Sequence, residues 1–264
     1  MSNSILKSID KFVQKQGKEA LRLLFVFKLV KSKLKEKVEV FIAGGANMAI
    51  RKLKISTKDI DLIVRRKHFE PLKKALISLG FKQNGSFFEK ENLRIDLFVD
   101  GISSSYSLSK DMIERAELYW SGEKLSAYLL SMEDLFLFKS FAGREVDIED
   151  CRILAEKGLN WSVILKEAVE QQEKTDRVIT ITLLDALDIL KDKYKIDVPI
   201  TRKLEPIVLQ KLILYSLEKS KTVKELVYIL QKPESTIRKQ LKKLLEQGKI
   251  TRVKKGKQYL YVKR

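Results

Sequence analysis

Two aspartates in one short segment have the type and spacing to do chemistry. Asp59 and Asp61 are one residue apart in DIDLIV, residues 59–64, a run that predicts a strand. Because side chains alternate along a strand, both carboxylates should project from one face while the aliphatic residues take the other. Two like charges this close repel, an arrangement best explained by a divalent cation that bridges them. A polar edge strand with two solvated aspartates is the alternative.

Asp96 supplies a third carboxylate. In LRIDLFV, residues 93–99, the apolar residues alternate and Asp96 projects from the opposite face. This strand should form a hairpin with Phe87–Glu89 and lie beside the strand that carries the other two aspartates. Three carboxylates could hold two metal ions, one activating an attacking hydroxyl and one steadying a triphosphate. The chemistry would be in-line displacement at the α-phosphate, with pyrophosphate leaving.

The composition limits the metal to one that prefers oxygen. The chain has one cysteine, Cys151, and one histidine, His68. These counts exclude a Cys-rich zinc site and a His-based cluster, and they make a Ser-His-Asp triad improbable. We therefore expect Mg²⁺ or Mn²⁺ as the cofactor and expect Cys151 and His68 to be structural residues.

Gly44-Gly45 separates a predicted strand, Val38–Ala43, from a predicted helix, Ala46–Leu53. Glycine permits a tight turn, and the backbone N–H groups that open a helix can face an incoming anion. The turn is not a P-loop, since no Gly-Lys-Ser/Thr follows, and it lacks the third glycine of a dinucleotide fingerprint. A purely structural turn is the alternative.

The pattern GG…TKDIDL…RIDLF resembles the polymerase-β-type nucleotidyltransferase superfamily over about residues 38–155. Within it, the chain is most similar to the bacterial and archaeal branch that includes AbiEii-like abortive-infection toxins. The resemblance implies that Gly44 and Gly45 cradle the triphosphate of an NTP and that the three aspartates bind metal. Many such toxins have a serine beside the first glycine, where this chain has Gly45.

A second stretch of the resemblance is KSFAGREVDIED, residues 139–150. By position it implies nucleotide-binding roles for Lys139, Arg144, Asp147 and Asp150. A cation at either of the first two positions could hold phosphate oxygens. The alternative for Asp147 is the N-cap of the next helix, with Asp150 in its first turn.

The positive charge is concentrated in the last quarter of the chain. Of the net +18, residues 201–264 carry +13. This part of the chain resembles a winged helix-turn-helix domain. It has three predicted helices, at 205–218, 223–230 and 235–247, followed by a predicted hairpin at 250–262. Its expected nucleic-acid contacts are basic residues of the third helix and the wing: Arg238, Lys239, Lys242, Lys243, Lys254, Lys255 and Lys257. A lysine-rich solubilising surface, or a winged helix used for protein contacts, is the alternative.

The expected architecture is α+β: a nucleotidyltransferase-fold mixed sheet with flanking helices and a helical extension over 1–200, then a winged helix over 201–264. Residues 1–37 and 160–195 are predicted helical, and 101–110 a loop. No segment is apolar enough to span a membrane, and a cytoplasmic location is expected. The leading hypothesis is a nucleotidyltransferase acting on RNA, such as a tRNA end. One alternative is a DNA-binding regulator or antitoxin-like protein whose nucleotidyltransferase fold senses nucleotide or is inactive. Another is an enzyme that transfers the nucleotide to a protein. A cognate antitoxin as partner also stays open.

Overall fold

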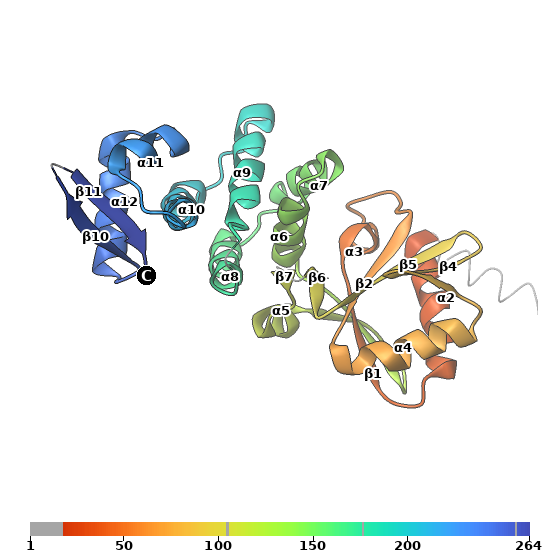
Figure 1. Cartoon of the computed structure of the whole chain (residues 1–264). Coiled ribbons are helices and arrows are strands. Elements are labelled where there is room, and N and C mark those ends of the chain that lie inside the picture. Colours follow the sequence, from red (N-terminus) through yellow and green to blue (C-terminus); the bar gives the residue numbers. More distant parts are fainter. Residues whose placement is uncertain (1–17, 104–105, 176, 257) are drawn as a thin grey trace, which may run out of the picture. The chain divides into compact units, whose positions relative to one another are not determined.

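The computed structural model describes residues 18–103, 106–175, 177–256 and 258–264 (Figure 1). Residues 1–17 of the first predicted helix therefore lie outside the described residues. The helices are α2 (Lys18–Lys33), α3 (Gly44–Ile50), α4 (Arg66–Ser78), α5 (Lys110–Arg115), α6 (Met132–Ala142), α7 (Glu145–Ala155), α8 (Trp161–Glu173), α9 (Thr180–Tyr194), α10 (Thr201–Ser216), α11 (Val223–Leu230) and α12 (Glu234–Glu246). The strands are β1 (Val38–Ile42), β2 (Asp59–Val64), β3 (Lys82–Asn84), β4 (Phe87–Lys90), β5 (Leu93–Val99), β6 (Gly101–Ser103), β7 (Tyr106–Ser107), β8 (Glu117–Ser121), β9 (Leu125–Leu129), β10 (Ile250–Lys255) and β11 (Gln258–Lys263).

The chain divides into two compact units, described separately. One contains the chain up to Lys139 together with Glu149–Leu159, and the other contains Ser140–Ile148 and Asn160–Arg264. The sequence-based domain boundary at residue 200 stays a prediction. In the described part of the chain, no helix is long and apolar enough to cross a membrane.

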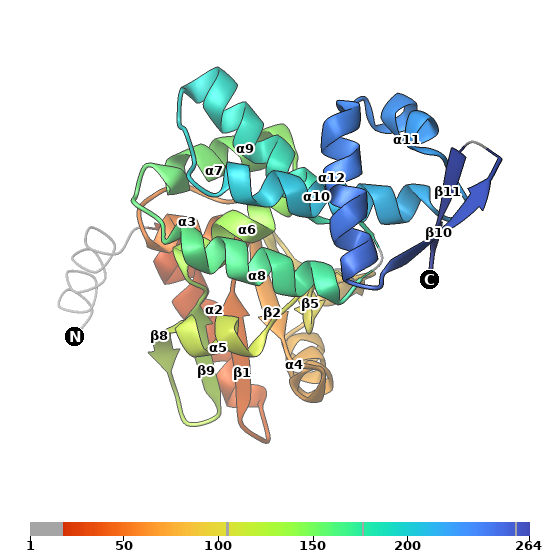
Figure 2. The same cartoon turned by 90° about the vertical axis from the view of Figure 1, so that its left-hand side faces the viewer.

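A mixed sheet forms the centre of the first unit, in the order β3-β4-β5-β2-β1-β9-β8. The predicted hairpin of β4 with β5 is confirmed, and so is the pairing of β2 with β5, which run parallel. Strand β1 lies antiparallel to β2 and parallel to β9. Figure 2 shows β1, β9 and β8 side by side at one edge. The chain turns directly from β1 into α3, so this helix begins at the end of a central strand.

One face of the sheet is buried under α2 and α4. Aliphatic residues of β2 and β5, such as Ile60 and Ile95, are fully buried in a core with Phe27 of α2 and Leu72 of α4. Burying apolar surface in this way is the main force holding helices to a sheet. The aspartates alternate with these residues, so they project from the opposite face of the sheet.

One local prediction was wrong in detail. The loop expected over 101–110 contains β6, β7 and the first residue of α5. The segment expected to be helical over 160–195 contains two helices, α8 and α9. Asn160 caps α8, and α9 begins at Thr180.

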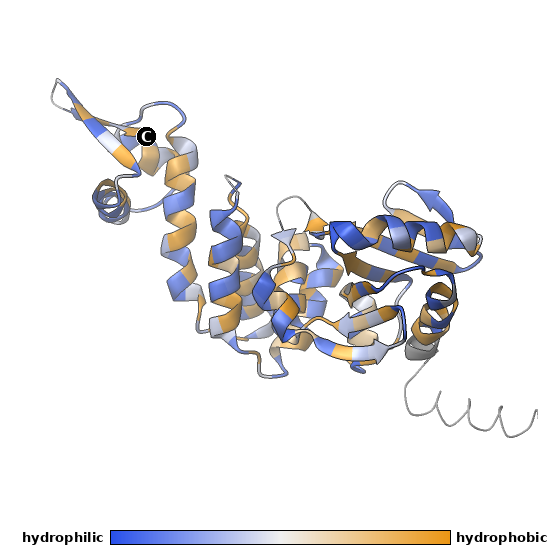
Figure 3. Cartoon of the chain, turned by 90° about the horizontal axis from the view of Figure 1, so that it is seen from below, coloured by the Kyte–Doolittle hydropathy of each residue, from blue (hydrophilic) through white to orange (hydrophobic). Residues whose placement is uncertain are grey.

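The second unit ends in three helices and a hairpin, as predicted. Buried residues of α10, α11 and α12 form one core with Ile250 and Tyr261 of the hairpin. A capping box starts α11, where Thr222 accepts a hydrogen bond from the Glu225 backbone and the Glu225 carboxylate accepts one in return. Strands β10 and β11 pair antiparallel. Figure 3 shows hydrophobic and hydrophilic residues alternating along the helices and strands of the chain, as amphipathic elements require.

Candidate active site

The register of two parallel strands brings the aspartates together. Asp61 of β2 lies directly opposite Asp96 of β5, and Asp59 lies opposite Arg94. Adjacent strands are about 4.8 Å apart, so register partners share a face and their side chains are neighbours. The expectation that Asp59, Asp61 and Asp96 would lie on one face of the sheet is therefore met by the geometry.

The glycine turn packs directly against Asp61. A Cβ atom on Gly44 would lie 1.8 Å from Asp61 Oδ2, and Gly44 has a φ of +54°. The Gly45 N–H donates a hydrogen bond to the Asp61 carboxylate, and the Ala43 N–H donates one to the Asp61 carbonyl at 2.9 Å. The first turn of α3 thus already uses one of its free N–H groups on a carboxylate, in the position where a helix N-terminus accepts an anion.

The surroundings of Asp61 raise the pKa of its carboxyl group. Burial, together with the nearby negative charges of Asp96 and Asp59, raises the pKa of Asp61 from 3.8 to about 6. Lys139 and the Gly45 N–H act in the opposite direction and lower this pKa. The ionised form of Asp61 is therefore disfavoured by burial and by its two neighbouring carboxylates.

Arg94 is a cation within the site that sequence reasoning missed. Its guanidinium lies 3.0 Å from Asp96 Oδ1 and 3.6 Å from Asp59 Oδ1, and it stacks over the Phe87 ring at 4.0 Å. The signal was available, because Arg94 is two residues before Asp96 in a strand and must share its face. Among the described residues, no three His, Cys, Asp or Glu side chains converge closely enough to form a ready-made metal cluster.

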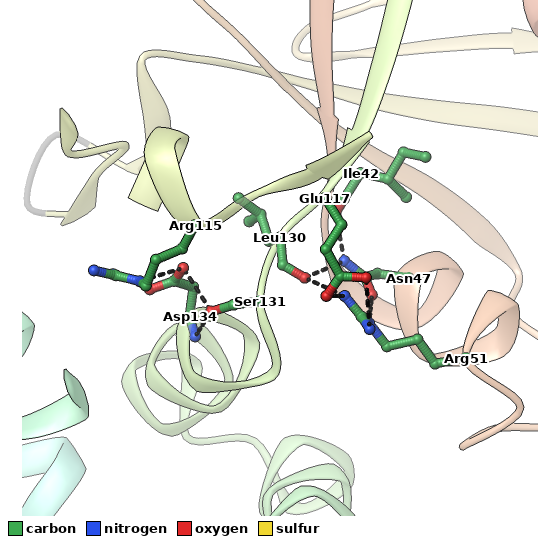
Figure 4. Close-up of polar contacts among 8 residues, drawn as sticks. All are labelled: Ile42, Asn47, Arg51, Arg115, Glu117, Leu130, Ser131 and Asp134. Carbon is green, nitrogen blue, oxygen red and sulfur yellow. Dashed lines mark hydrogen bonds and ion pairs between the residues drawn. The ribbon is translucent and has the colours of Figure 1, made fainter. Parts of the chain in front are cut away.

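A buried amide fixes the helix that carries the glycines (Figure 4). The side chain of Asn47 in α3 is completely buried, and its Nδ2 donates to the Ile42 carbonyl at 2.8 Å and the Leu130 carbonyl at 3.0 Å. Arg51 donates to Asn47 Oδ1 at 2.9 Å and to the Leu130 carbonyl at 3.1 Å. These bonds tie α3 to the ends of β1 and β9. A lone Asn in an apolar helix gave no sequence signal of this role.

The buried carboxylate of Asp134, also drawn in Figure 4, fixes the start of α6. The Ser131 hydroxyl accepts a hydrogen bond from the Asp134 N–H and donates to Asp134 Oδ2 at 2.8 Å. Arg115 pairs with the same carboxylate at 2.6 Å. Ser131 therefore caps α6, and α6 in turn carries Lys139.

Lys139 links the aspartates to Asp150. Its ammonium group lies 2.9 Å from Asp150 Oδ2, and Lys54 lies 3.0 Å from the same carboxylate. Asp150 is 2% exposed. The alternative that Asp150 lies in the first turn of the helix is wrong, because α7 begins at Glu145. The buried Asp150 carboxylate is paired with two lysines.

Arg144 and Asp147 pair with each other at 2.5 Å, in the other compact unit. Helix α7 begins at Glu145, so Asp147 lies inside it and is completely buried. The alternative that Asp147 is the N-cap is wrong, because the helix starts two residues before it. The nucleotide-binding roles inferred for both residues stay predictions.

The basic residues of the winged helix lie on exposed surfaces. In α12 the four cations Arg238, Lys239, Lys242 and Lys243 are exposed, opposite the buried Ile237 and Leu241. Lys254 and Lys255 at the tip of the hairpin are also exposed, and Lys257 lies outside the described residues. Arg238 pairs with Glu234 and Lys242 with Glu246, both one helical turn away, so part of this charge is balanced within the helix.

Comparison with known families agrees with this architecture. The mixed sheet with its flanking helices and C-terminal winged helix defines a nucleotidyltransferase fold joined to a helix-turn-helix module. Residues 21–180 match the model of the family described as nucleotidyltransferase of unknown function, DUF6036, and the chain belongs to this family. Residues 209–251 match the model described as bacterial regulatory protein, arsR family. The AbiEii-like branch is not among these matches.

Two solved structures share a limited similarity. A crystal structure of ANT(2″)-Ia in complex with adenylyl-2″-tobramycin is 13% identical, with a TM-score of 0.43 over 58% of this chain and 99% of that one. A solution structure of the antibiotic-resistance factor ANT(2″)-Ia is 12% identical, with a TM-score of 0.43 over 60% and 94%. The sequence has no significant match among curated proteins.

Gly44→Ala should destabilise the protein far more than Gly85→Ala. Both positions have positive φ, at +54° and +59°, so each substitution carries a backbone cost of about 1–2 kcal/mol. A Cβ at Gly85 meets nothing within 4 Å, whereas one at Gly44 collides with Asp61. Urea unfolding of both variants measures the difference. Equal destabilisation would show that the close approach of Gly44 to Asp61 does not constrain the fold.

Asp61→Asn should stabilise the fold above about pH 7. The folded-state pKa of Asp61 is raised, so the stability contribution of this group is full below 3.8 and is lost as the pH rises to about 6. Asparagine keeps an acceptor for the Gly45 N–H but carries no charge, so the gain should reach about 1–3 kcal/mol at neutral pH. Urea unfolding in EDTA at about pH 4 and about pH 7 measures it. The exposed Asp192→Asn is the control, and a gain that does not grow with pH contradicts the assignment.

Proposed function

We propose that the chain is a metal-dependent nucleotidyltransferase that moves a nucleotide from an NTP to a nucleic-acid acceptor, plausibly an RNA end. The observation that carries the proposal is the register of β2 with β5, which sets Asp61 beside Asp96 next to the Gly44-Gly45 turn. Membership of a nucleotidyltransferase family supports the reaction class.

The donor set suits a hard divalent cation. All the candidate ligands are carboxylate oxygens, of Asp59, Asp61 and Asp96. Burial and the neighbouring negative charges raise the pKa of Asp61, which supports a site where a bound cation would stabilise the ionised carboxylates. We propose that these residues hold Mg²⁺ or Mn²⁺. When bound, the cation would neutralise charge on the triphosphate and lower the barrier to displacement. Arg94 is 44% exposed at its side chain and has room to leave the carboxylates.

The remaining steps are assigned to groups of the chain. The acceptor hydroxyl oxygen bonds to the α-phosphorus while the bond from that phosphorus to the pyrophosphate oxygen breaks, and the hydroxyl proton passes to Asp96. N–H groups of the turn at Gly44 and Gly45 would hold phosphate oxygens, as would Lys139. Nucleotide-binding roles for Arg144, Asp147 and Asp150, which the polymerase-β-type resemblance implies, stay predictions.

The winged helix is proposed to hold the nucleic acid. Exposed cations on α12 and the hairpin can neutralise phosphates without reading sequence. The match to a helix-turn-helix family of bacterial regulators favours a second candidate function, a DNA-binding regulator whose nucleotidyltransferase unit only senses nucleotide. Three acidic residues gathered on one face favour the enzyme, because a sensor has no need of them. A cognate antitoxin as partner stays a prediction.

Asp96→Asn separates the two functions. The enzyme hypothesis predicts near-normal NTP affinity and transfer reduced roughly 100-fold or more, because asparagine keeps the shape but cannot accept the hydroxyl proton. Asp100→Asn is the matched control, since Asp100 instead accepts a hydrogen bond from the Arg66 N–H of α4. Labelled-NTP transfer onto total RNA, NTP affinity and DNA binding are measured on the same proteins. A parent protein that transfers nothing to RNA or protein with any NTP overturns the enzyme hypothesis.

Lys242→Glu with Lys243→Glu should weaken nucleic-acid binding and flatten its salt dependence. Each lost phosphate contact removes about 0.9 from the slope of log affinity against log salt, so the pair should remove about two units. Lys82→Glu with Lys110→Glu, two exposed lysines of the other unit, changes the net charge equally. Affinity is measured for duplex DNA and for RNA over a salt series. Equal losses in both double variants would mean that overall charge, not the α12 surface, drives binding.

A further inference from the structure

A second polar hollow lies at the opposite end of the sheet from the aspartates. It has a volume of about 590 Å³. Its lining comes from the start of β1, the first turn of α4 and the turn between β8 and β9. Strand β1 runs from Val38 in this hollow to Ile42, just before the Gly44-Gly45 turn. Five residues of strand span about 17 Å, so the hollow is separate from the candidate active site.

His68, the one histidine of the chain, lines this hollow with an unsatisfied ring nitrogen. The residue is 8% exposed, and its Nε2 is buried without a hydrogen-bond partner. Glu39 Oε2 is 3.7 Å away, too far for a hydrogen bond. A buried polar atom left unpaired destabilises the folded state, so native proteins rarely retain one without a reason.

Charges around His68 favour a neutral imidazole that can donate from Nε2. Burial lowers its pKa, and the positive charges of Lys67 and Arg65 lower it further, whereas Glu39 and Glu36 act in the opposite direction. A neutral ring that carries its proton on Nε2 is a donor for an anion's oxygen. Sequence analysis assigned this histidine a structural role, because nothing in the sequence placed a cavity beside it.

Three lysines surround the same hollow. Lys37, Lys67 and Lys124 line it, and none of them forms an ion pair with any carboxylate in the part of the chain that the structure describes. Glu39 and Glu123 also line it, which leaves a small positive excess. That balance suits one phosphate group better than a polyphosphate chain.

The start of α4 adds to the positive potential. Its N-cap is Arg65, and its first turn contains Arg66, Lys67 and His68 and no acidic residue. The carboxylate of Asp100 accepts a hydrogen bond from the Arg66 N–H, so one acidic side chain from outside the helix lies at this end. Helix N-termini carry a partial positive charge and favour acidic residues, so the cations of this turn are unfavourable there. Asp100 offsets part of this repulsion, and a bound anion would offset more.

We propose that this hollow is a phosphate-binding site, in which Lys37, Lys67, Lys124 and the His68 imidazole hold a single phosphate group. The site is independent of the nucleotidyl-transfer proposal. Its ligand is a phosphate dianion, either free inorganic phosphate or the terminal phosphate of an oligonucleotide. The hydroxyl groups of Ser121 and Ser126 in the lining can donate further hydrogen bonds to its oxygens.

Because His68 is the one histidine, full-length protein labelled with ¹⁵N-histidine has a single imidazole to observe. Titration with inorganic phosphate, followed by NMR, should shift the ring signals saturably with a Kd of about 1 mM or lower. It should also raise the pKa of His68, since a bound anion favours the imidazolium ion. Ring signals and a pKa that do not respond to phosphate or to a 5′-phosphorylated oligonucleotide overturn the proposal.

Variants and ligand pairs identify the binding groups and the source of the phosphate. Lys67→Gln with Lys124→Gln should weaken the response about 10-fold or more, whereas Lys73→Gln, on the same helix but outside the lining, should not. An equal response in all variants contradicts the assignment. A 5′-phosphorylated oligoribonucleotide is compared with its unphosphorylated twin. A shift with the phosphorylated one alone identifies a nucleic-acid terminus, a shift with inorganic phosphate alone identifies the free ion, and equal shifts with both oligonucleotides overturn a phosphate-specific site.

Discussion

The contact between the Gly44 backbone and the Asp61 carboxylate is the constraint on which the candidate active site depends. It lets the turn between β1 and α3 close over the start of β2, which no residue with a Cβ at position 44 would permit. Asn47 holds α3 in that position through the carbonyls of Ile42 and Leu130. The helix N-terminus and the carboxylates are therefore fixed relative to each other before any ligand binds, as a preorganised site requires.

The same closeness creates an electrostatic imbalance. Burial of Asp61, together with the negative charges of Asp96 and Asp59 beside it, raises its pKa. Arg94 offsets part of this charge from within the sheet, and Lys139 offsets part from α6. Lys139 is also bound to the buried Asp150, so its charge is divided between two carboxylates. A site with too little positive charge of its own is suited to a ligand that brings cations with it.

The two kinds of surface in the chain suit different tasks. The candidate active site gathers carboxylates, whereas α12 and the hairpin of the winged helix expose lysine and arginine. The carboxylates would repel a nucleic-acid backbone and the basic module would attract it. An enzyme that acts on nucleic acid needs both surfaces, and a regulator needs the second alone, so the acidic residues favour the enzyme.

The sequence by itself determined the alternation of the aspartates along β2 and β5, the glycine turn, and the order of helices and strands in the winged helix. These follow from local periodicity and from the backbone freedom of glycine, which act over a few residues. Tertiary structure alone decided which residues met across long separations. It set Asp61 in register with Asp96, placed Arg94 between carboxylates, buried Asp150 between two lysines, and left the His68 ring nitrogen unpaired in a hollow. Each of these depends on burial and on neighbours distant in the chain, and a local pattern contains neither.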